Sequence, residues 1–177
     1  MKKLGLADAL TVCKATPEDA RGYAACHNAC WQEVYTGMVP TAFLEKMAAA
    51  QETYTAHYAE RLSHPGDCDY YLVLSGTQVS GFVIINRGEV AESPGAREIW
   101  AIYLREAFWG QGHGRLLLDF AVAQLRPLAT QTIFLWVFEE NHCARRFYEK
   151  NGFLFDGTVR EADYGGPVRQ LRYTYTL

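Results

Sequence analysis

Two stretches of the chain share one arrangement of apolar and polar positions: an apolar run, a short turn, and a second run with helical spacing. The first stretch begins at Glu98 and reads EIWAIYL, FWGQGHG and RLLLDFAVAQL. The second begins at Ile133 and reads IFLWVF, EEN and HCARRFYEK, followed by NGFLF. Runs of β-branched and aromatic residues predict strands, whereas apolar residues three or four apart predict helices. Each stretch is therefore predicted to form a strand, a turn and a helix.

The N-terminal third of the chain is predicted to be mostly helical. A strand over residues 9–14 precedes Thr16-Pro17-Glu18-Asp19, in which Thr16 can cap a helix and Asp19 has capping-box spacing. This helix is expected to end within residues 31–35. Pro40 then opens a further helical region, which reaches about residue 62.

Strands dominate the remainder of the chain. Residues 69–74 and 79–86 are apolar and flank Ser75-Gly76-Thr77-Gln78, which predicts a hairpin. Residues 88–97 are polar and are expected to form a loop. We expect further strands at residues 98–104, 132–138, 153–159 and 168–175, and helices at 112–125 and 141–150. The predicted fold is a mixed α/β (α+β) fold with a central sheet, in one domain that covers residues 1–177.

Length and composition agree with one globular domain. The 177 residues are 49% hydrophobic and 21% charged, a balance typical of folded chains. The net charge of −3 lacks the basic excess of nucleic-acid-binding proteins, so no nucleic-acid partner is expected. No apolar run approaches the roughly 20 residues that span a bilayer. The N-terminal segment lacks the apolar core of a secretion signal. We therefore expect a cytoplasmic protein without a membrane partner.

Cysteine and histidine spacing gives no sign of a metal site. The five cysteines are scattered and form no CxxC pair, which indicates neither a disulfide scaffold nor a zinc knuckle. His113 has no partner at metal-ligand spacing. No metal is expected.

The turn after the first of the two strands is rich in glycine. Gly110, Gly112 and Gly114 alternate with other residues, which allows a ligand to approach the backbone closely. The helix that starts there directs its free amides and positive dipole end toward the turn. A phosphate or pyrophosphate is the expected occupant, and Arg115 is placed to add a charge-assisted hydrogen bond.

Two other phosphate-binding motifs do not fit this turn. It lacks the Lys-Ser/Thr of a nucleoside-triphosphate loop, and its spacing is G-x-G-x-G rather than the dinucleotide-binding G-x-G-x-x-G. A tight strand-to-helix turn without a ligand remains the structural alternative. Gln111 and His113 are expected to face solvent.

The helix after the second strand carries a stripe of polar, small and phenolic side chains. At about 100° per residue, Asn141, Ala144 and Tyr148 fall within an arc of roughly 60°, whereas Phe147 and Cys143 point elsewhere. Asn141 can cap the helix and bond amide groups of a ligand, and Ala144 leaves room beside it. Tyr148 can act as a general acid toward a departing thiolate. Its structural alternative is a core aromatic residue.

The segments FWGQGHGRLLL and WVFEENHCARRFYEKNGF resemble the two signatures of the GNAT superfamily of acyl-CoA-dependent N-acyltransferases. The first signature is Q/R-x-x-G-x-G/A, and the second is roughly N-x-x-A-x-x-F-Y-x-x-x-G-F. Trp109 departs from the first, because the family often has Gln or Arg there. The residues that match are Gly112 and Gly114 in the first signature and Asn141, Ala144, Phe147, Tyr148, Gly152 and Phe153 in the second.

The resemblance implies a mostly antiparallel sheet of about seven strands, splayed between the fourth and fifth and flanked by about four helices. Acetyl-CoA is expected to bind in the splay as co-substrate. Amides from Trp109 to Arg115 would hold its pyrophosphate, and backbone groups of the fourth strand its pantetheine arm. The residues implied to bind the cofactor are Ile102, Tyr103, Leu104, Trp109, Gly110, Gln111, Gly112, His113, Gly114, Arg115, Asn141, Ala144, Arg145 and Tyr148.

Glu98 is the candidate base, because many relatives carry a glutamate on the fourth strand that acts directly or through a water. An ammonium must lose a proton before it attacks. An inward carboxylate flanked by Ile99 and Trp100 would have its pKa raised by desolvation, which suits a base. The structural alternative is that Glu98 ends the strand in solvent or pairs with Arg97.

The acceptor side is expected to include Trp31, Tyr35 and Glu33, because WQEVYTGMVPTAFL resembles the acceptor wall of a GNAT subgroup. Trp31 and Tyr35 share a helical face and can stack on an amine, although a hydrophobic seam is the alternative. Glu33 can meet a cation or stay solvated. The loop at Tyr164 can close the mouth of the splay or join a homodimer.

Together these features predict an acetyl-CoA-dependent N-acetyltransferase that acts on a small-molecule primary amine in a ternary complex. A protein N-terminal or lysine acetyltransferase is one alternative. The other is a non-catalytic acyl-CoA-binding regulatory module, which would not need Tyr148 or Glu98.

Overall fold

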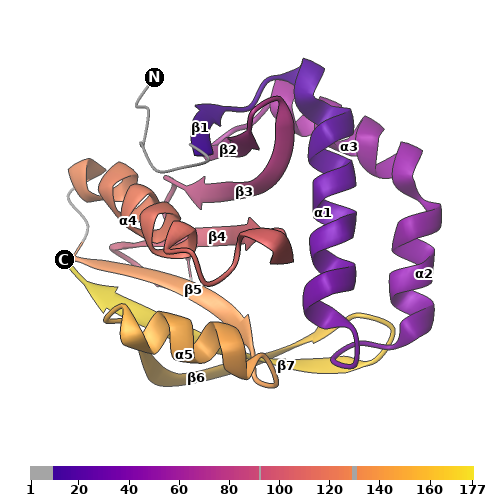
Figure 1. Ribbon diagram of the computed structural model, residues 1–177. Helices are drawn as coiled ribbons and strands as arrows, with labels where there is room; N and C mark the ends of the chain where they lie inside the picture. The colour runs from indigo at the N-terminus through magenta and orange to yellow at the C-terminus, as the bar shows by residue number, and fades with distance from the viewer. Residues whose placement is uncertain (1–9, 92, 129–130) are drawn as a thin grey trace.

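A seven-stranded sheet in the order β1-β2-β3-β4-β5-β7-β6 runs through the molecule (Figure 1). The computed structural model describes residues 10–91, 93–128 and 131–177. Neighbouring strands are antiparallel except β4 and β5, which are parallel. The strands are β1 (Leu10–Lys14), β2 (Cys68–Ser75), β3 (Gln78–Asn86), β4 (Ala96–Leu104), β5 (Thr132–Phe138), β6 (Leu154–Asp163) and β7 (Pro167–Thr176).

Helices cover both faces of the sheet. Helices α1 and α3 pack on one face, α2 lies beside α1, and α4 and α5 pack on the other face (Figure 1). The described residues contain five α-helices rather than the expected four, because the backbone leaves the helical conformation at Ala50 and divides one predicted region into two. The helices are α1 (Ala20–Tyr35), α2 (Thr41–Ala49), α3 (Gln51–Ser63), α4 (His113–Leu125) and α5 (His142–Lys150).

Local sequence signals placed most element ends correctly. The capping box at Thr16 is present, with the Thr16 amide donating to Asp19 Oδ2 at 2.8 Å. The hairpin of β2 and β3 turns at Gly76, as expected. The first predicted strand included Ala9, which lies outside the described residues. The predicted loop over residues 88–97 is shorter, because Ala96 and Arg97 already pair with β5.

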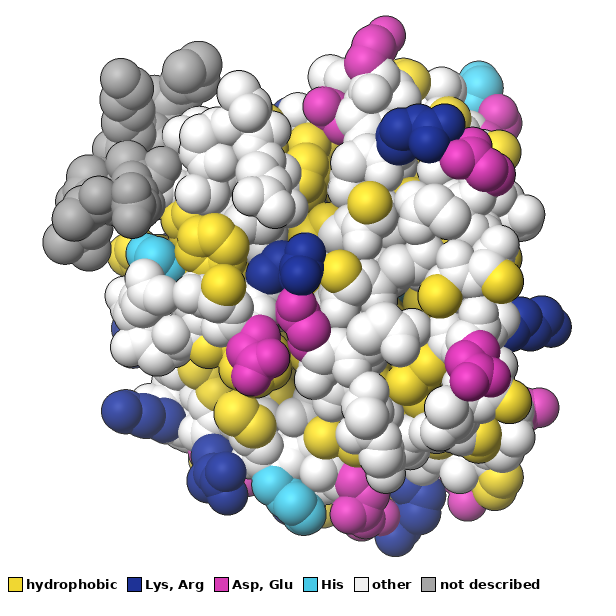
Figure 2. Space-filling view, turned by 45° about the vertical axis from the view of Figure 1, so that its right-hand side comes forward, with side chains coloured by type: hydrophobic (Ala, Val, Ile, Leu, Met, Phe, Trp, Pro, Cys, Tyr) yellow, Lys and Arg dark blue, Asp and Glu magenta, His cyan; other side chains and the backbone are white. Residues whose placement is uncertain are grey.

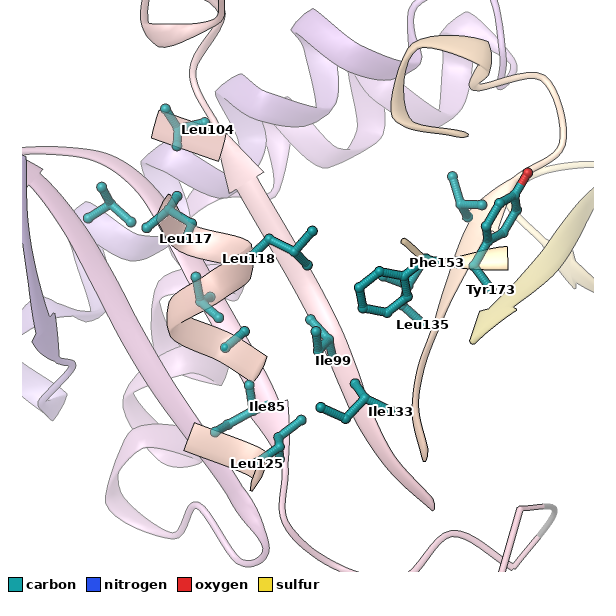
Figure 3. Close-up of a cluster of buried hydrophobic side chains, with 14 of the residues drawn as sticks. Ile85, Ile99, Leu104, Leu117, Leu118, Leu125, Ile133, Leu135, Phe153 and Tyr173 are labelled. Atoms are coloured by element: carbon teal, nitrogen blue, oxygen red, sulfur yellow. The ribbon is translucent and has the colours of Figure 1, made fainter. Parts of the chain in front are cut away.

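The core forms two hydrophobic layers, one on each face of the sheet. Figure 3 shows the layer beneath α4, where Ile99, Leu117, Leu118 and Phe153 are almost completely buried. The second layer packs α1 and α3 against β2 and β3 around Tyr23. Each fully buried side chain of this size stabilises the fold by about 1.5–3 kcal/mol. The two layers hold the sheet from both sides and fix the strand ends that carry the candidate site.

The ladder between β4 and β5 is unusually short. Only residues 96–98 of β4 pair with residues 132–134 of β5, and the last pair is Glu98 with Phe134. In Figure 3 the two strands lie together near Ile133 and separate toward Leu104. A β-bulge at Trp100 shifts the register of β4 on β3 next to this point, and bulges bend strands. Residues 99–104 of β4 and 135–138 of β5 do not pair with each other. We call these two segments the splayed region.

The surface carries mixed charges. On the face drawn in Figure 2, Lys and Arg side chains are interspersed with Asp and Glu and form no basic patch among the described residues. In the part of the chain that the structure describes, no helix has both the length and the apolar character needed to cross a membrane.

Candidate active site

The two strand–turn–helix stretches of the sequence meet at one end of the splayed region. Because β4 and β5 are parallel, their carboxyl ends lie at the same edge of the sheet, and α4 and α5 both begin there. In open sheets, ligands bind outside the carboxyl ends of strands at such a point. Neither helix has an acidic residue in its first turn, so neither positive helix end is compensated by a carboxylate there.

The glycine-rich turn adopts a backbone that side chains would strain. Gly110 has a φ of 72° and Gly112, the residue that caps α4, a φ of 83°. Both angles lie in the left-handed region, which costs other residues roughly 1–2 kcal/mol. Among the described residues, no protein group accepts a hydrogen bond from the amides of residues 110–115. The turn therefore presents a row of unoccupied backbone donors.

Trp109 closes the turn onto β4. Its indole Nε1 donates to the Leu104 carbonyl oxygen at 2.7 Å, and its own amide donates to the Glu106 carbonyl at 3.0 Å. The Trp109 amide is thus already used within the protein, unlike those that follow it. Gln111 is exposed, as expected, and its Nε2 donates to the Ala107 carbonyl at 2.9 Å. These bonds hold the turn in place before any ligand binds.

His113 does not face solvent, contrary to expectation. Its exposed fraction is 7%, because the first turn of α4 directs the imidazole toward Phe108, with ring centroids 6.3 Å apart. Its buried Nδ1 has no hydrogen-bond partner. The described residues contain no group of three or more His, Cys, Asp or Glu side chains that could share a metal ion.

Two arginines expected at the cofactor make contacts within the protein. The Arg115 guanidinium binds Asp119, with Nε 2.8 Å from Oδ2, and donates to Asn151 Oδ1 at 2.8 Å. Arg145 donates to the Tyr173 hydroxyl at 3.2 Å and to the Glu139 carbonyl at 2.8 Å. These bonds use Nε and Nη1 of each guanidinium and hold both side chains against the protein.

Helix α5 carries Asn141 at its N-terminal end, and Ala144 and Tyr148 along its length. The Asn141 side-chain oxygen accepts from the Ala144 amide at 3.0 Å and caps the helix. Ala144 and Tyr148 pack on the core layer beneath α4, and so does Phe147. A Cβ atom at Gly114 would lie 3.4 Å from the Phe147 ring, so the first turn of α4 is in close contact with the second turn of α5. The two strand–turn–helix stretches therefore meet beside the splayed region.

Three tyrosine hydroxyls gather at the splayed region. The Tyr35 and Tyr103 hydroxyls are hydrogen-bonded at 2.7 Å. Burial raises the pKa of both phenols well above the usual range, and the nearby Tyr148 phenol adds to this rise. Burial also raises the pKa of Tyr148 to about 12. All three hydroxyls therefore stay protonated at neutral pH and can donate hydrogen bonds.

Glu98 lies at the root of the splayed region. It is half-buried and belongs to the last ladder pair, with its side chain on the same face of the sheet as Phe134. Ile99 is buried as expected, but Trp100 is 45% exposed, so only one neighbour contributes an apolar wall. Arg97 pairs with Glu89, with Arg97 Nη1 2.8 Å from Glu89 Oε1.

The expected acceptor residues divide into two groups. Trp31 and Tyr35 are in contact, with ring centroids 4.6 Å apart. Glu33 lies elsewhere on α1: Arg105 Nε donates to its Oε1 at 2.7 Å and the Glu106 amide to its Oε2 at 2.9 Å. Glu33 thus ties α1 to the segment before the glycine-rich turn.

Sequence reasoning missed Phe138 and Phe43, and it expected Tyr103 at the cofactor rather than in this group of rings. Phe138 at the end of β5 packs on Tyr35 at 4.4 Å, and Tyr103 of β4 reaches the same ring. Phe43 of α2 contacts Trp31 at 5.7 Å. Alternation along β4 and β5 would place Tyr103 and Phe138 on one face, but their shared contact depends on how α1 crosses the sheet.

His27 lies beside Trp31 among aromatic rings. Its imidazole contacts Trp31, Tyr58 and Phe82 at centroid distances of 5.7 Å. Burial lowers the pKa of His27 to about 4, and Nδ1 has no hydrogen-bond partner. The environment next to Trp31 therefore disfavours a cationic nitrogen.

Comparisons with known proteins agree with this geometry. The family model described as Acetyltransferase (GNAT) family matches residues 30–153. A probable N-acetyltransferase of Mycobacterium tuberculosis is 29% identical over 143 residues, which cover 81% of this chain and 79% of that protein.

Two crystal structures share the fold. PaiA N-acetyltransferase from Thermoplasma acidophilum, solved in complex with coenzyme A, has a TM-score of 0.70 at 18% identity, covering 95% of this chain and 99% of that one. An acetyltransferase from Thermus thermophilus has a TM-score of 0.67 at 20% identity, covering 95% of this chain and 97% of that one. At these identities the likeness concerns the fold alone.

The pKa of His27 predicts a pH dependence of stability. Between pH 6.5 and about 4 the unfolded chain binds a proton at His27 that the folded chain does not, so the free energy of unfolding should fall as pH falls through this window. Denaturant titrations of the wild type and His27→Leu from pH 7 to 4.5 measure this. The variant should lose less stability over that window, and identical slopes would contradict the shift.

Proposed function

Because the chain belongs to the GNAT acetyltransferase family, we propose that it transfers the acetyl group of acetyl-CoA to a primary amine of a small-molecule acceptor. The observation that carries the proposal is the meeting of two features at one end of the splayed region. One is the row of unoccupied amides over residues 110–115, and the other is the phenol of Tyr148. The amides can bind the diphosphate of an acyl donor, and the phenol can donate a hydrogen bond to its departing thiolate.

The pyrophosphate of acetyl-CoA binds at the glycine-rich turn. Amides of residues 110–115 and the positive end of α4 supply the donors, and no carboxylate in the first turn opposes them. Glycine at residues 110 and 112 permits the left-handed backbone that directs these amides outward. Trp109 stands where the family often has Gln or Arg. Its indole bonds the Leu104 carbonyl oxygen and so fixes the turn, instead of binding the pyrophosphate.

The pantetheine arm lies along the splayed part of β4. Residues 102–104 pair with β3 on one edge, while β5 no longer pairs with the other edge beyond Glu98. Backbone groups on that edge need partners when water is excluded. The amides of pantetheine can supply them as an added strand would.

The acceptor amine loses a proton before it attacks. Glu98 at the root of the splayed region takes this proton, directly or through a water. The amine lone pair then forms the bond to the thioester carbonyl carbon, and backbone amides stabilise the resulting oxyanion. Collapse of this intermediate breaks the carbon–sulfur bond and releases the thiolate of coenzyme A, while the nitrogen loses its second proton to solvent and becomes the neutral amide of the product.

The Tyr148 hydroxyl donates a hydrogen bond to the departing sulfur. With a pKa of about 12, this phenol is protonated over the whole neutral range. An ordinary thiol has a pKa of about 8.5, so the thiolate is a weaker base than the tyrosinate. A strong hydrogen bond therefore stabilises the thiolate without complete proton transfer. Cys143 is exposed and does not lie on the stripe of Tyr148, so a covalent enzyme intermediate is not part of the proposal.

The direct test is release of free thiol from acetyl-CoA by the full chain in the presence of small amines, amino acids or peptides. Amine-dependent release with a small molecule supports the proposal. Release only with peptides would favour a protein acetyltransferase. Tight binding of acetyl-CoA without release would favour a regulatory acyl-CoA-binding module. Gel filtration tests the proposed homodimer separately.

Gly112→Val tests the pyrophosphate turn. A β-branched side chain at a φ of 83° should displace the amides of the turn, so the Kd for acetyl-CoA should rise at least about tenfold. Isothermal titration calorimetry measures it. Gly157→Val is the matched control, because Gly157 has a φ of 89° and also has open space around it, but lies in β6. Equal Kd values for the two variants would remove the turn from cofactor binding.

Tyr148→Phe tests the thiolate donor. Loss of the hydroxyl should lower kcat on the order of 10²-fold, while the Kd for acetyl-CoA changes little because the ring remains. Steady-state kinetics and calorimetry separate the two quantities. Tyr71→Phe, which removes a hydroxyl from β2, should leave both unchanged. Wild-type turnover by Tyr148→Phe would rule out the role.

Glu98→Gln tests the base. Removing the carboxylate should lower kcat/KM and change the acidic limb of its pH profile, because the amine then loses its proton acceptor. Glu60→Gln at an exposed position of α3 is the control. If the acidic limb of Glu98→Gln coincides with that of the wild type, another group or the acceptor itself sets it.

A further inference from the structure

Six aromatic side chains surround the acceptor face of the splayed region. They come from five segments of the chain and contact one another: Trp31 packs on Tyr35, Tyr35 on Phe138 at 4.4 Å, and Phe138 on Tyr164 at 5.1 Å. We call this set the aromatic cluster; its members are Trp31, Tyr35, Phe43, Tyr103, Phe138 and Tyr164.

The aromatic cluster spans the place where β4 and β5 part. Tyr103 projects from β4 and Phe138 from β5, and both contact Tyr35 of α1. The Tyr148 phenol belongs to α5, which packs on the other face of the sheet. It is nevertheless near enough to raise the pKa of Tyr35 and of Tyr103. A thioester placed in the splayed region would therefore have Tyr148 on one side and the aromatic cluster on the other.

One polar atom in the cluster is left without a partner. The indole Nε1 of Trp31 is buried and donates to no acceptor, although the residue is only 8% exposed. Roughly nine in ten buried polar groups are paired in folded proteins. This unpaired donor lies among rings that are otherwise packed on one another, which distinguishes the cluster from an ordinary core.

Carboxylates next to the cluster in the chain are bonded elsewhere. Glu33 binds Arg105, and Glu139 binds Arg169 with Oε2 2.8 Å from Nη1. Asp163 accepts from the amides of the following loop. Glu45, beside Leu44, is exposed on α2.

Positive charge already occupies the same face of β5. The Arg172 guanidinium lies 5.8 Å from the Phe134 ring, and that of Arg160 lies 4.1 Å from the Trp136 ring. His27, beside Trp31, is held neutral by burial. Asp156 is already bound to Arg172, with its Oδ2 2.6 Å from Nε. Glu98 is the proposed base for the reacting amine itself, so none of the carboxylates named here is assigned to a second nitrogen.

We infer that the acceptor is a monoamine whose body is aliphatic or aromatic and carries no second charge. The inference rests on the acetyl transfer proposed above. The cluster receives the body of the acceptor through apolar contact and excludes water. The Tyr35–Tyr103 pair accepts a hydrogen bond from the amine N–H through a phenol lone pair, which leaves the nitrogen lone pair for the thioester. A second ammonium would be desolvated without a partner, which is costly.

Hexylamine and 1,6-diaminohexane provide the matched test, because they differ only in a second amine at the far end. With the full chain and acetyl-CoA, kcat/KM for thiol release should be at least about tenfold higher with hexylamine, and phenethylamine should also be used well. Equal or better use of the diamine would overturn the inference and leave the transfer function intact. No thiol release with any amine would instead contradict the proposed function.

Tyr164→Leu localises the effect to the cluster. Its loop position makes loss of folding less of a concern, and it contacts Trp31, Phe43 and Phe138. The variant should raise the KM for hexylamine and phenethylamine several-fold without changing the Kd for acetyl-CoA. Tyr71→Leu, which removes a half-buried ring that packs on Phe120 of α4, should change neither. Equal KM values for Tyr164→Leu and the wild type would place the acceptor outside the cluster.

Discussion

The arrangement of the site depends on the early end of the ladder between β4 and β5. Two parallel strands that stop pairing after Glu98 and Phe134 leave backbone groups on their facing edges unpaired with each other. Such groups are costly inside a protein unless something bonds them. The bulge at Trp100 and the two core layers hold the strands in this state. The fold thus maintains an incomplete sheet, which a ligand with amide groups can complete.

The same constraint brings the remaining parts together. Parallel strands end at one edge, so α4 and α5 both start there and touch through Gly114 and Phe147. One side of this edge consists of backbone donors, whereas the other side consists of aromatic rings. In the proposed function a diphosphate would bind on the first side, and an amine with an apolar body would bind on the second. Glu33 links the sides, because it joins α1 to the segment before the glycine-rich turn.

Features of the fold that depend on neighbouring residues could be predicted from the sequence. Features that depend on contacts between distant elements could not. The sequence correctly predicted the helix caps at Thr16 and Asn141, because a cap depends on residues close by in the chain. The same holds for the turns that need glycine, at Gly76 and at residues 110 and 112. The burial of His113 depends on Phe108 and the core beneath α4, and no local pattern indicates it. Likewise, the partners of Glu33 and Arg115 lie on other elements or further along the helix. Tyr103 and Phe138 join one cluster only because α1 crosses both strands.

The central claim is that the amides of residues 110–115 hold a diphosphate. Backbone amide NMR of the full chain, titrated with coenzyme A and separately with pantetheine, tests it directly, because pantetheine lacks the diphosphate. The account predicts that both ligands shift the amides of residues 102–104, whereas only coenzyme A shifts those of residues 110–115. Shifts of residues 110–115 that are absent with coenzyme A, or equally large with pantetheine, would contradict it.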